Sequence, residues 1–194
     1  YLTLDRLLND LARGTARILV VAAAAFPLSA VASASCEDWH VEFLSVEGSV
    51  QIQRAGTTIW QTANLGDRVC TGDTVRVPAY GRASVRLPDT SKITLKHNSS
   101  VTFESGGEVT GWLLRLLRGA LHVISRDPRE LRFSTPYANA GLEGTEFTIE
   151  VSDDRTSVAV VEGEVVVTSD SGRVNVLPGE LSATPRFSQQ QQQI

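Results

Sequence analysis

The chain has 194 residues, of which 42% are hydrophobic and 21% charged, an ordinary balance for a globular protein. A domain of this length can bury a real core, so neither a metal ion nor several disulfides are needed for folding. The net charge of −4 and the pI near 5.4 argue against nucleic acid as the main partner, because phosphate binding requires a basic surface.

The first part of the chain, residues 1–34, has the pattern of a secretory signal peptide. Arginines precede an apolar run over residues 18–28, and small residues follow that run. The triplet Ala32-Ser33-Ala34 suits a signal peptidase and predicts cleavage between Ala34 and Ser35. The apolar run is shorter than the ~20 residues that a spanning helix needs, and an uncleaved anchor is the alternative. The sequence therefore predicts a helical signal peptide, only transient membrane contact, and a periplasmic, secreted or cell-surface location.

The next segment, residues 35–45, leads into the folded part and contains the first of two cysteines. Cys36 and Cys70 both lie beyond the predicted cleavage site, so in an exported chain they can form one disulfide. Such a bridge would stabilise the fold by roughly 3–4 kcal/mol through the loop that it closes. Two unpaired, buried thiols are the alternative.

Beyond residue 40, short segments with alternating or β-branched side chains follow one another, separated by Gly, Asp and Pro turn residues. The segment 111–119 could form a short helix, but we predict that it is extended. Many short strands with closely spaced turns predict an all-β domain, either a layered sandwich or a short solenoid. The predicted strands are 41–43, 50–53, 74–77, 84–87, 92–95, 100–103, 121–124, 131–134, 146–151, 156–161, 164–168 and 173–177.

Three segments share an apolar–x–Gly–x–apolar–x–apolar pattern, at residues 46–52, 117–123 and 161–167. The glycine in each is expected to supply a positive φ or a bulge where one strand gives way to the next. The spacing between the copies is unequal, which argues against a strict solenoid repeat. The pattern indicates a layered β architecture built from similar corners, and the three glycines are Gly48, Gly119 and Gly163.

The last segment, residues 181–194, ends in a run of five glutamines after Ser188. Such a tract buries almost nothing and is typical of a linker or tail. The sequence therefore predicts one β domain over residues 46–180.

A series of short motifs runs through this predicted domain. Its residues, for which we expect structural roles, are Gly48, Trp60, Gly66, Gly72, Asp73, Gly81, Thr135, Pro136, Gly144, Thr145, Phe147, Gly163 and Gly179. In this order and spacing the motifs resemble the FecR domain of exported bacterial proteins, with Thr135-Pro136-Tyr137-Ala138 and the following Gly144-Thr145-Glu146-Phe147 as the strongest segment.

The resemblance implies an extracytoplasmic β module that receives a signal or contacts a protein partner or a cell-envelope component. The family often has an arginine before the Gly-Thr pair, where this chain has Glu143, so an anion contact by that arginine is not expected here. The segment before the apolar run is short, so the cytoplasmic anti-sigma segment of full-length FecR regulators is not expected in this chain either.

Individual motif residues also have plain structural interpretations. The Gly72-Asp73 pair predicts a turn stabilised by the aspartate, and Gly144-Thr145 predicts a strand corner whose hydroxyl bonds a neighbouring turn. The three tryptophans are expected to be core or edge-capping residues rather than a sugar platform, and they are Trp39, Trp60 and Trp112.

No sequence motif points to catalysis, a metal or a cofactor. The histidines His40, His97 and His122 lack the paired spacing of a zinc site, and no Gly-x-Ser-x-Gly motif is present. A two-carboxylate hydrolase would need convergent acids. The expected strand carboxylates instead suit a solvated outer face, and they are Glu42, Glu104 and Glu150. We therefore predict that the protein is not an enzyme and has no cofactor.

The sequence thus favours a non-catalytic binding or sensing module that acts by protein–protein contact in the cell envelope. Its strand edges and turns would form the recognition surface, and strand addition is the simplest mode. A glycan- or peptidoglycan-binding module is one alternative, which an exposed pair of tryptophans would favour. A structural spacer within a larger surface protein is the other.

Overall fold

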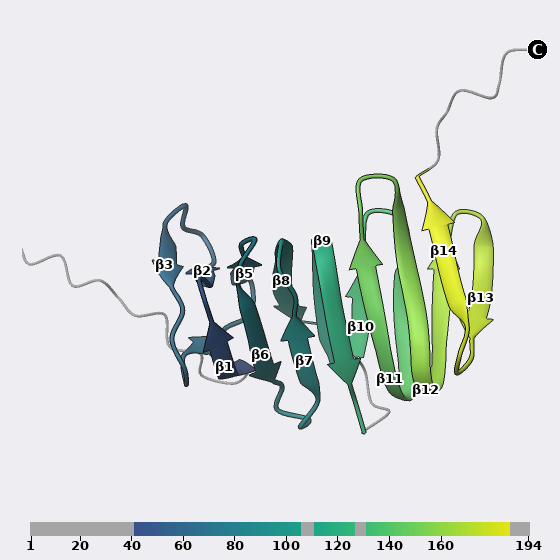
Figure 1. Ribbon diagram of the computed structural model, residues 1–194, viewed down its shortest axis with the longest axis horizontal. Helices are drawn as coiled ribbons and strands as arrows, with labels where there is room; N and C mark the ends of the chain where they lie inside the picture. The colour runs from purple at the N-terminus through teal and green to yellow at the C-terminus, as the bar shows by residue number, and fades with distance from the viewer. Residues whose placement is uncertain (1–40, 106–110, 127–130, 187–194) are drawn as a thin grey trace, which may run out of the picture. The chain divides into compact units, whose positions relative to one another are not determined.

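In the described part of the computed structural model, fourteen β-strands are joined into one continuous hydrogen-bonded network (Figure 1). The structure describes residues 41–105, 111–126 and 131–186. Every regular element in these ranges is a strand, so the all-β prediction is confirmed. Within the same ranges, no helix is long and apolar enough to cross a bilayer. The predicted signal peptide and its cleavage site at Ala34 and Ser35 lie outside the described residues.

The strand pairing folds this network into two layers. The layer farther from the viewer in Figure 1, the first layer, begins with β3 (Trp60–Thr62), β2 (Gln51–Gln53), β5 (Thr74–Val77) and β8 (Ser99–Ser105). It continues with the first half of β9 (Trp112–Ile124), β10 (Leu131–Ser134), the first half of β11 (Asn139–Val151), the second half of β12 (Arg155–Ser169) and β13 (Gly172–Val176).

The nearer layer, the second layer, uses the other halves of the same long strands. Its order is β4 (Arg68–Val69), β1 (Val41–Glu47), β6 (Arg82–Arg86), β7 (Lys92–Leu95), the second halves of β9 and β11, the first half of β12, and β14 (Leu181–Pro185). β9, β11 and β12 therefore belong to both layers.

Glycines lie where the chain passes from one layer to the other. Gly48 follows β1, Gly119 divides β9 and Gly163 divides β12, with φ of 66°, 86° and 81°. A Cβ at Gly119 would lie 2.5 Å from the Cα of Ser99, and one at Gly163 would lie 2.5 Å from the carbonyl oxygen of Gly144. Both the backbone angle and the close neighbour exclude a side chain at these corners.

The core lies between the two layers and is filled by the inward side chains of alternating strands. Phe43, Phe103, Phe133 and Phe147 are among its largest fully buried members. The ring of Phe133 in β10 meets the ring of Phe147 in β11 edge to face, with centroids 5.5 Å apart. Because one ring comes from each layer, this pair ties the layers together.

The predicted and observed strands agree best where the alternation is clearest. The segments 74–77, 92–95 and 131–134 have the predicted bounds, and the stretch 111–119 is extended as predicted, within β9. The strand set begins at Val41 and continues through β14, whose residues the sequence assigned to the tail. β3, β4 and β14 were not predicted, because short edge strands bury few side chains and show little alternation.

Candidate binding groove

The Gly72-Asp73 turn is joined to the turn after β2 through the Asp73 side chain. The Asp73 carboxylate, 2% exposed, accepts a hydrogen bond from Arg54 Nη1 at 2.7 Å. It also accepts the backbone N–H groups of Ala55 and Cys70, both at 2.9 Å. The aspartate is thus a buried structural anchor with all of these donors satisfied, rather than a ligand-facing carboxylate.

The Gly144-Thr145 corner packs against the Gly163 corner. The Thr145 methyl group faces Gly163, where an added Cβ would lie 2.7 Å from it. The Thr145 hydroxyl is buried and has no hydrogen-bond partner among the described residues, so the prediction that it bonds a neighbouring turn is wrong. The link to the neighbouring segment is made by backbone instead, since Ser125 N–H donates to the Thr145 carbonyl at 2.9 Å.

The other motif residues within the described ranges occupy turns and core. Gly66 and Gly179 have φ of 78° and 84° in open turns. Gly81 leaves no room for a side chain, because an added Cβ would lie 2.6 Å from the Ser49 carbonyl oxygen. Phe147 lies in the core.

The described tryptophans do not form an exposed pair. Trp112 is buried, at 3% exposed, and Trp60 lies on the edge strand β3 with the Arg76 guanidinium 4.2 Å from its ring centroid. Trp39 lies outside the described residues. The two described tryptophan rings therefore do not form an exposed aromatic surface on which a sugar could stack.

Cys70 lies between β4 and β5, where its N–H bonds Asp73. Cys36 lies outside the described residues, so the predicted Cys36–Cys70 bridge stays a prediction.

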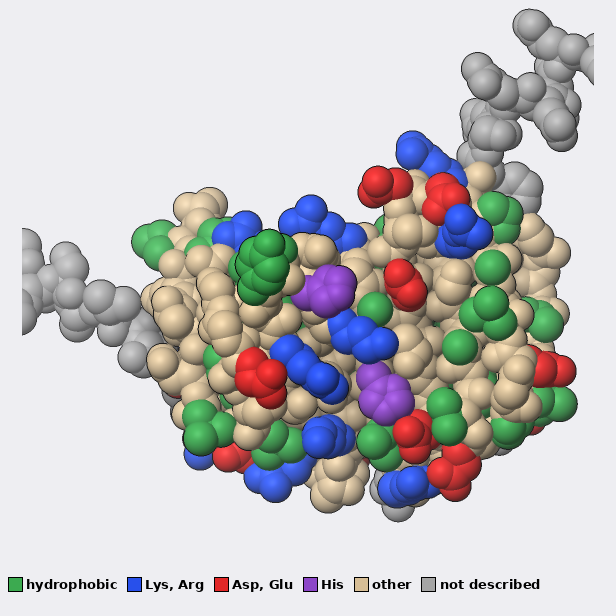
Figure 2. Space-filling view, in the orientation of Figure 1, with side chains coloured by type: hydrophobic (Ala, Val, Ile, Leu, Met, Phe, Trp, Pro, Cys, Tyr) green, Lys and Arg blue, Asp and Glu red, His purple; other side chains and the backbone are tan. Residues whose placement is uncertain are grey.

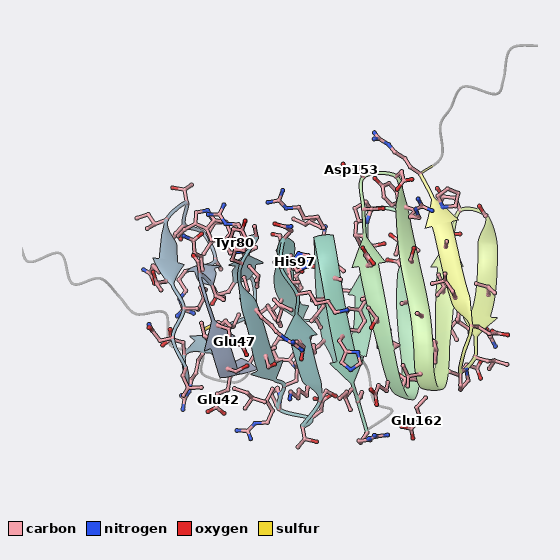
Figure 3. All side chains as sticks on the ribbon, in the orientation of Figure 1. Glu42, Glu47, Tyr80, His97, Asp153 and Glu162 are labelled. Atoms are coloured by element: carbon pink, nitrogen blue, oxygen red, sulfur yellow. The ribbon has the colours of Figure 1, made fainter. Side chains whose placement is uncertain are left out.

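The Thr135–Ala138 turn is closed by its own threonine. The Thr135 hydroxyl lies 2.6 Å from the Ala138 carbonyl oxygen and 2.8 Å from the Thr156 hydroxyl, and it accepts the Ala138 N–H at 3.0 Å. The Tyr137 hydroxyl donates to the Asp153 carbonyl at 2.8 Å. Asp153 is labelled at the upper end of the strands in Figure 3. The turn thereby becomes a fixed rim at this end of the first layer.

A groove of about 570 Å³ lies on the outer face of the first layer beside this rim. Strand register places its floor residues side by side, since Arg132 pairs with Gly141, Gly141 with Val166, and Thr168 with Arg173. Gly141 has no side chain and open space above it, so the floor is low at this point. The lining residues are Leu113, Arg132, Phe133, Asn139, Ala140, Gly141, Val166, Thr168 and Arg173.

A second hollow of about 480 Å³ adjoins the first and shares Asn139 and Thr168 with it. We call the two hollows together the C-terminal groove. The second is lined by Thr135, Pro136, Tyr137, Ala138, Asn139, Thr168, Ser169, Asp170, Pro185 and Arg186. Arginine, amide and hydroxyl groups predominate among the polar side chains of both hollows, a set suited to binding an extended ligand rather than to proton transfer.

The charged pairs near the ends of the strands are exposed. The hydrogen bond that Ser152 donates to Asp154, aided by Arg155, lowers the pKa of Asp154. A hydrogen bond of 2.6 Å to Glu162 raises the pKa of Arg126. Exposed pairs of this kind contribute little to stability.

Carboxylates on the strands lie on open faces. Glu42 is paired with Arg86 at 2.6 Å and Glu104 with Arg115 at 3.0 Å, while Glu150 is exposed. In the part of the chain that the structure describes, no group of three or more His, Cys, Asp or Glu side chains could hold a metal ion.

The sequence did not single out the floor of the C-terminal groove. Arg132, Gly141, Val166 and Arg173 come from four consecutive strands, β10 to β13, and the register between these strands places them side by side. The available signal was the outward phase of each alternating strand, which places Arg132, Thr168 and Arg173 on one face.

Residues 73–166 match the family model described as FecR protein. No curated protein sequence matches the chain. Two crystal structures of a candidate anti-sigma factor from Parabacteroides distasonis ATCC 8503, at 1.65 Å and 2.50 Å resolution, are similar to it, each with 19% identity and a TM-score of 0.49. Each alignment covers 60% of this chain and 61% of the other, so it spans about three-fifths of those proteins.

The matched residues run from β5 to the second half of β12 and include the Asp73 turn, the Thr135–Ala138 rim and the Gly144 and Gly163 corners. Gly48, Trp60, Gly66, Gly72 and Gly179 lie outside the match. The likeness of this chain to FecR proteins is therefore carried by residues 73–166.

Proposed function

We propose that this protein is a non-catalytic binding or sensing module of the cell envelope that acts by protein–protein contact. The observation that carries the proposal is the C-terminal groove, which is open, rigidly rimmed and continuous with a free strand edge. The match of residues 73–166 to the FecR family model and the ion-paired strand carboxylates support a binding role over a catalytic one.

This edge is β13, the last strand of the first layer, which pairs with β12 alone among the described strands. Arg173 belongs to this strand and also lines the groove, and Val174 beside it is 48% exposed. A partner strand added against β13 would extend the first layer. Its outward side chains would then lie next to Arg173 and Thr168, so backbone pairing and side-chain recognition would occur together.

Glycan binding is the weaker candidate. A sugar platform needs an exposed aromatic face, whereas the Trp60 ring is covered by Arg76 and Trp112 is buried. Nothing at the described tryptophans favours it over a protein partner.

Site-specific photo-crosslinking in envelope extract tests the proposal. A crosslinking residue in place of Asn175, on β13, should capture one defined protein, whereas the same residue in place of Gln61, on the opposite edge strand β3, should not. Val174→Lys should lower the capture about ten-fold, equivalent to about 1.4 kcal/mol, because a lysine on an edge strand opposes strand addition.

Ile59→Lys is the matched control, since Ile59 is 66% exposed and lies beside β3. It should leave capture at position 175 unchanged. Equal capture at positions 61 and 175, or capture that Val174→Lys leaves intact, would contradict strand addition at β13.

A further inference from the structure

Four cationic side chains gather on the outer face of the second layer, which Figure 2 shows. They are Arg82 and Arg86 at the two ends of β6, Lys92 at the start of β7, and Lys96 directly after β7. All four are exposed. Arg86 lies opposite Lys92 in the β6–β7 ladder, and the Ala83–Leu95 pair places Arg82 beside Lys96. We call these four residues the basic band.

The floor of the basic band consists of hydroxyl groups. Ser84 and Thr94 are paired between the two sets of cations, and their hydroxyl oxygens lie 3.2 Å apart. Although both face outward, they are only 7% and 5% exposed. At ~3.3 Å per residue, the two cations on each strand are separated by about 13 Å along the strand. The band is thus a short polar channel with a cation pair at each end.

Most of the charge of the basic band is not neutralised within the domain. Arg86 is paired with Glu42, at 2.6 Å. Arg82, Lys92 and Lys96 make no ion pair with any other described residue. Like charges opposite each other in a sheet are destabilising, so the fold gains nothing from Lys92 opposite Arg86. These charges are available to a partner.

Acidic side chains border the basic band on both sides. Glu42 and Glu47 on β1 are labelled on one side of it in Figure 3, and β11 carries Glu146 and Glu150 on the other. His122, on β9 between the band and β11, lies 3.3 Å from Glu146. A broad anionic surface such as a lipid bilayer would meet these carboxylates and be repelled. A narrow, linear anion that follows β6 and β7 would meet only the cations.

We propose that the basic band binds an extended acidic polypeptide segment that carries carboxylates at alternate positions. An extended chain places every second side chain on the same face, with the repeat of the strands below it. Two carboxylates four positions apart would therefore match the Lys92–Lys96 spacing without distortion, and the carboxylate between them would lie over the Ser84 and Thr94 hydroxyls. This surface is on the opposite face from the C-terminal groove, so the two proposals succeed or fail separately.

Titration of the full chain with synthetic peptides tests this inference. The probe is a peptide of alternating Glu and Thr, compared with a peptide of the same composition whose Glu residues form one block. The alternating peptide should bind more tightly. Its affinity should fall steeply between low salt and about 0.5 M salt, because exposed charge pairs are screened.

Paired variants locate the binding site. K92Q/K96Q should weaken binding of the alternating peptide by roughly five-fold or more, since two exposed ion pairs are lost. R115Q/R118Q removes the same charge from β9, within its half in the first layer, and should leave binding nearly unchanged. Circular dichroism would show that both variants keep the β fold.

Several outcomes would overturn the inference. Equal weakening by both double variants would mean that only net charge matters, and equal binding of the two peptides would remove the spacing argument. An oligogalacturonate, or vesicles of anionic lipid, that bound the chain more tightly than the alternating peptide would assign the band to an acidic glycan or a membrane instead.

Discussion

At the scale of single residues, Asp73 is a buried carboxylate that holds two turns together through its side chain. Its carboxylate is almost fully enclosed and satisfies donors from Arg54, Ala55 and Cys70. These donors belong to the turn after β2 and the turn before β5. Removing the charge would leave the partly buried Arg54 guanidinium without its ionic partner, which is costly in a setting of low polarity.

Asp73→Asn should lower the free energy of unfolding by about 2–4 kcal/mol, because an amide cannot accept from all three donors and carries no charge. Urea unfolding followed by circular dichroism measures this change. Glu42→Gln is the control, since Glu42 and Arg86 are exposed and their pair should contribute less than about 1 kcal/mol. Similar losses in the two variants would argue that burial of Asp73 is unimportant.

The sequence predicted this turn but not the hydrogen bonds that Asp73 makes with the turn after β2. The Gly-Asp pair predicts a turn by local chemistry alone, whereas the contact with Ala55, 18 residues away, depends on how β2 and β5 pair. The prediction for the Thr145 hydroxyl was wrong for the same reason, because it too used local sequence alone. Its environment is set by Gly163, from another strand.

At the scale of elements, the glycine corners decide where strands change layer. Gly119 combines a φ of 86° with a neighbour, Ser99, that leaves no space for a methyl group. The Ser99 hydroxyl also bridges the N–H and carbonyl groups of Ala120 at 3.0 Å. A side chain at position 119 would thus displace the segment that fixes the bend in β9.

Gly119→Ala should lower the free energy of unfolding by about 2–4 kcal/mol, through left-handed backbone strain together with overlap against Ser99. Thermal and urea unfolding measure this loss. Gly141→Ala is the matched control, because Gly141 has an ordinary φ and nothing within 4 Å of an added Cβ. Equal stability of the two variants would mean that the bend does not need glycine.

The elements that the sequence predicted well are those with a clear inward and outward face, such as β5, β7 and β10. The recurring apolar–x–Gly pattern located three corners, since each is local. It did not show that β9 pairs with β10 in parallel and with β11 antiparallel, because pairing is chosen by contacts far apart in sequence. The C-terminal groove depends on the register of β10 to β13, and the basic band on the register of β6 and β7, so neither was located from the sequence alone.

At the scale of the whole molecule, the predicted Cys36–Cys70 disulfide would tie the start of the exported chain to the Asp73 turn. Free-thiol titration of the exported, unreduced protein should find no reactive thiol after denaturation. Reduction should then lower the free energy of unfolding by roughly 3–4 kcal/mol, through the loop that is released. Two reactive thiols in the unreduced protein would contradict the bridge.

The two faces of the domain have different surfaces. The first layer carries the C-terminal groove next to an open edge, and the second carries the basic band between acidic borders. The long strands β9, β11 and β12 connect the two layers that carry these surfaces, since each contributes to both layers.

This sharing has a mechanical consequence. Sliding one layer over the other would require β9, β11 and β12 to stretch or to rebend at Gly119, Gly144 and Gly163, where two of these glycines are already in contact. The two layers are therefore connected by the continuous backbone of β9, β11 and β12 as well as by side-chain packing. A force applied to one layer would therefore be transmitted along the backbone of these three strands to the other layer, and we expect the two layers to move as one rigid body.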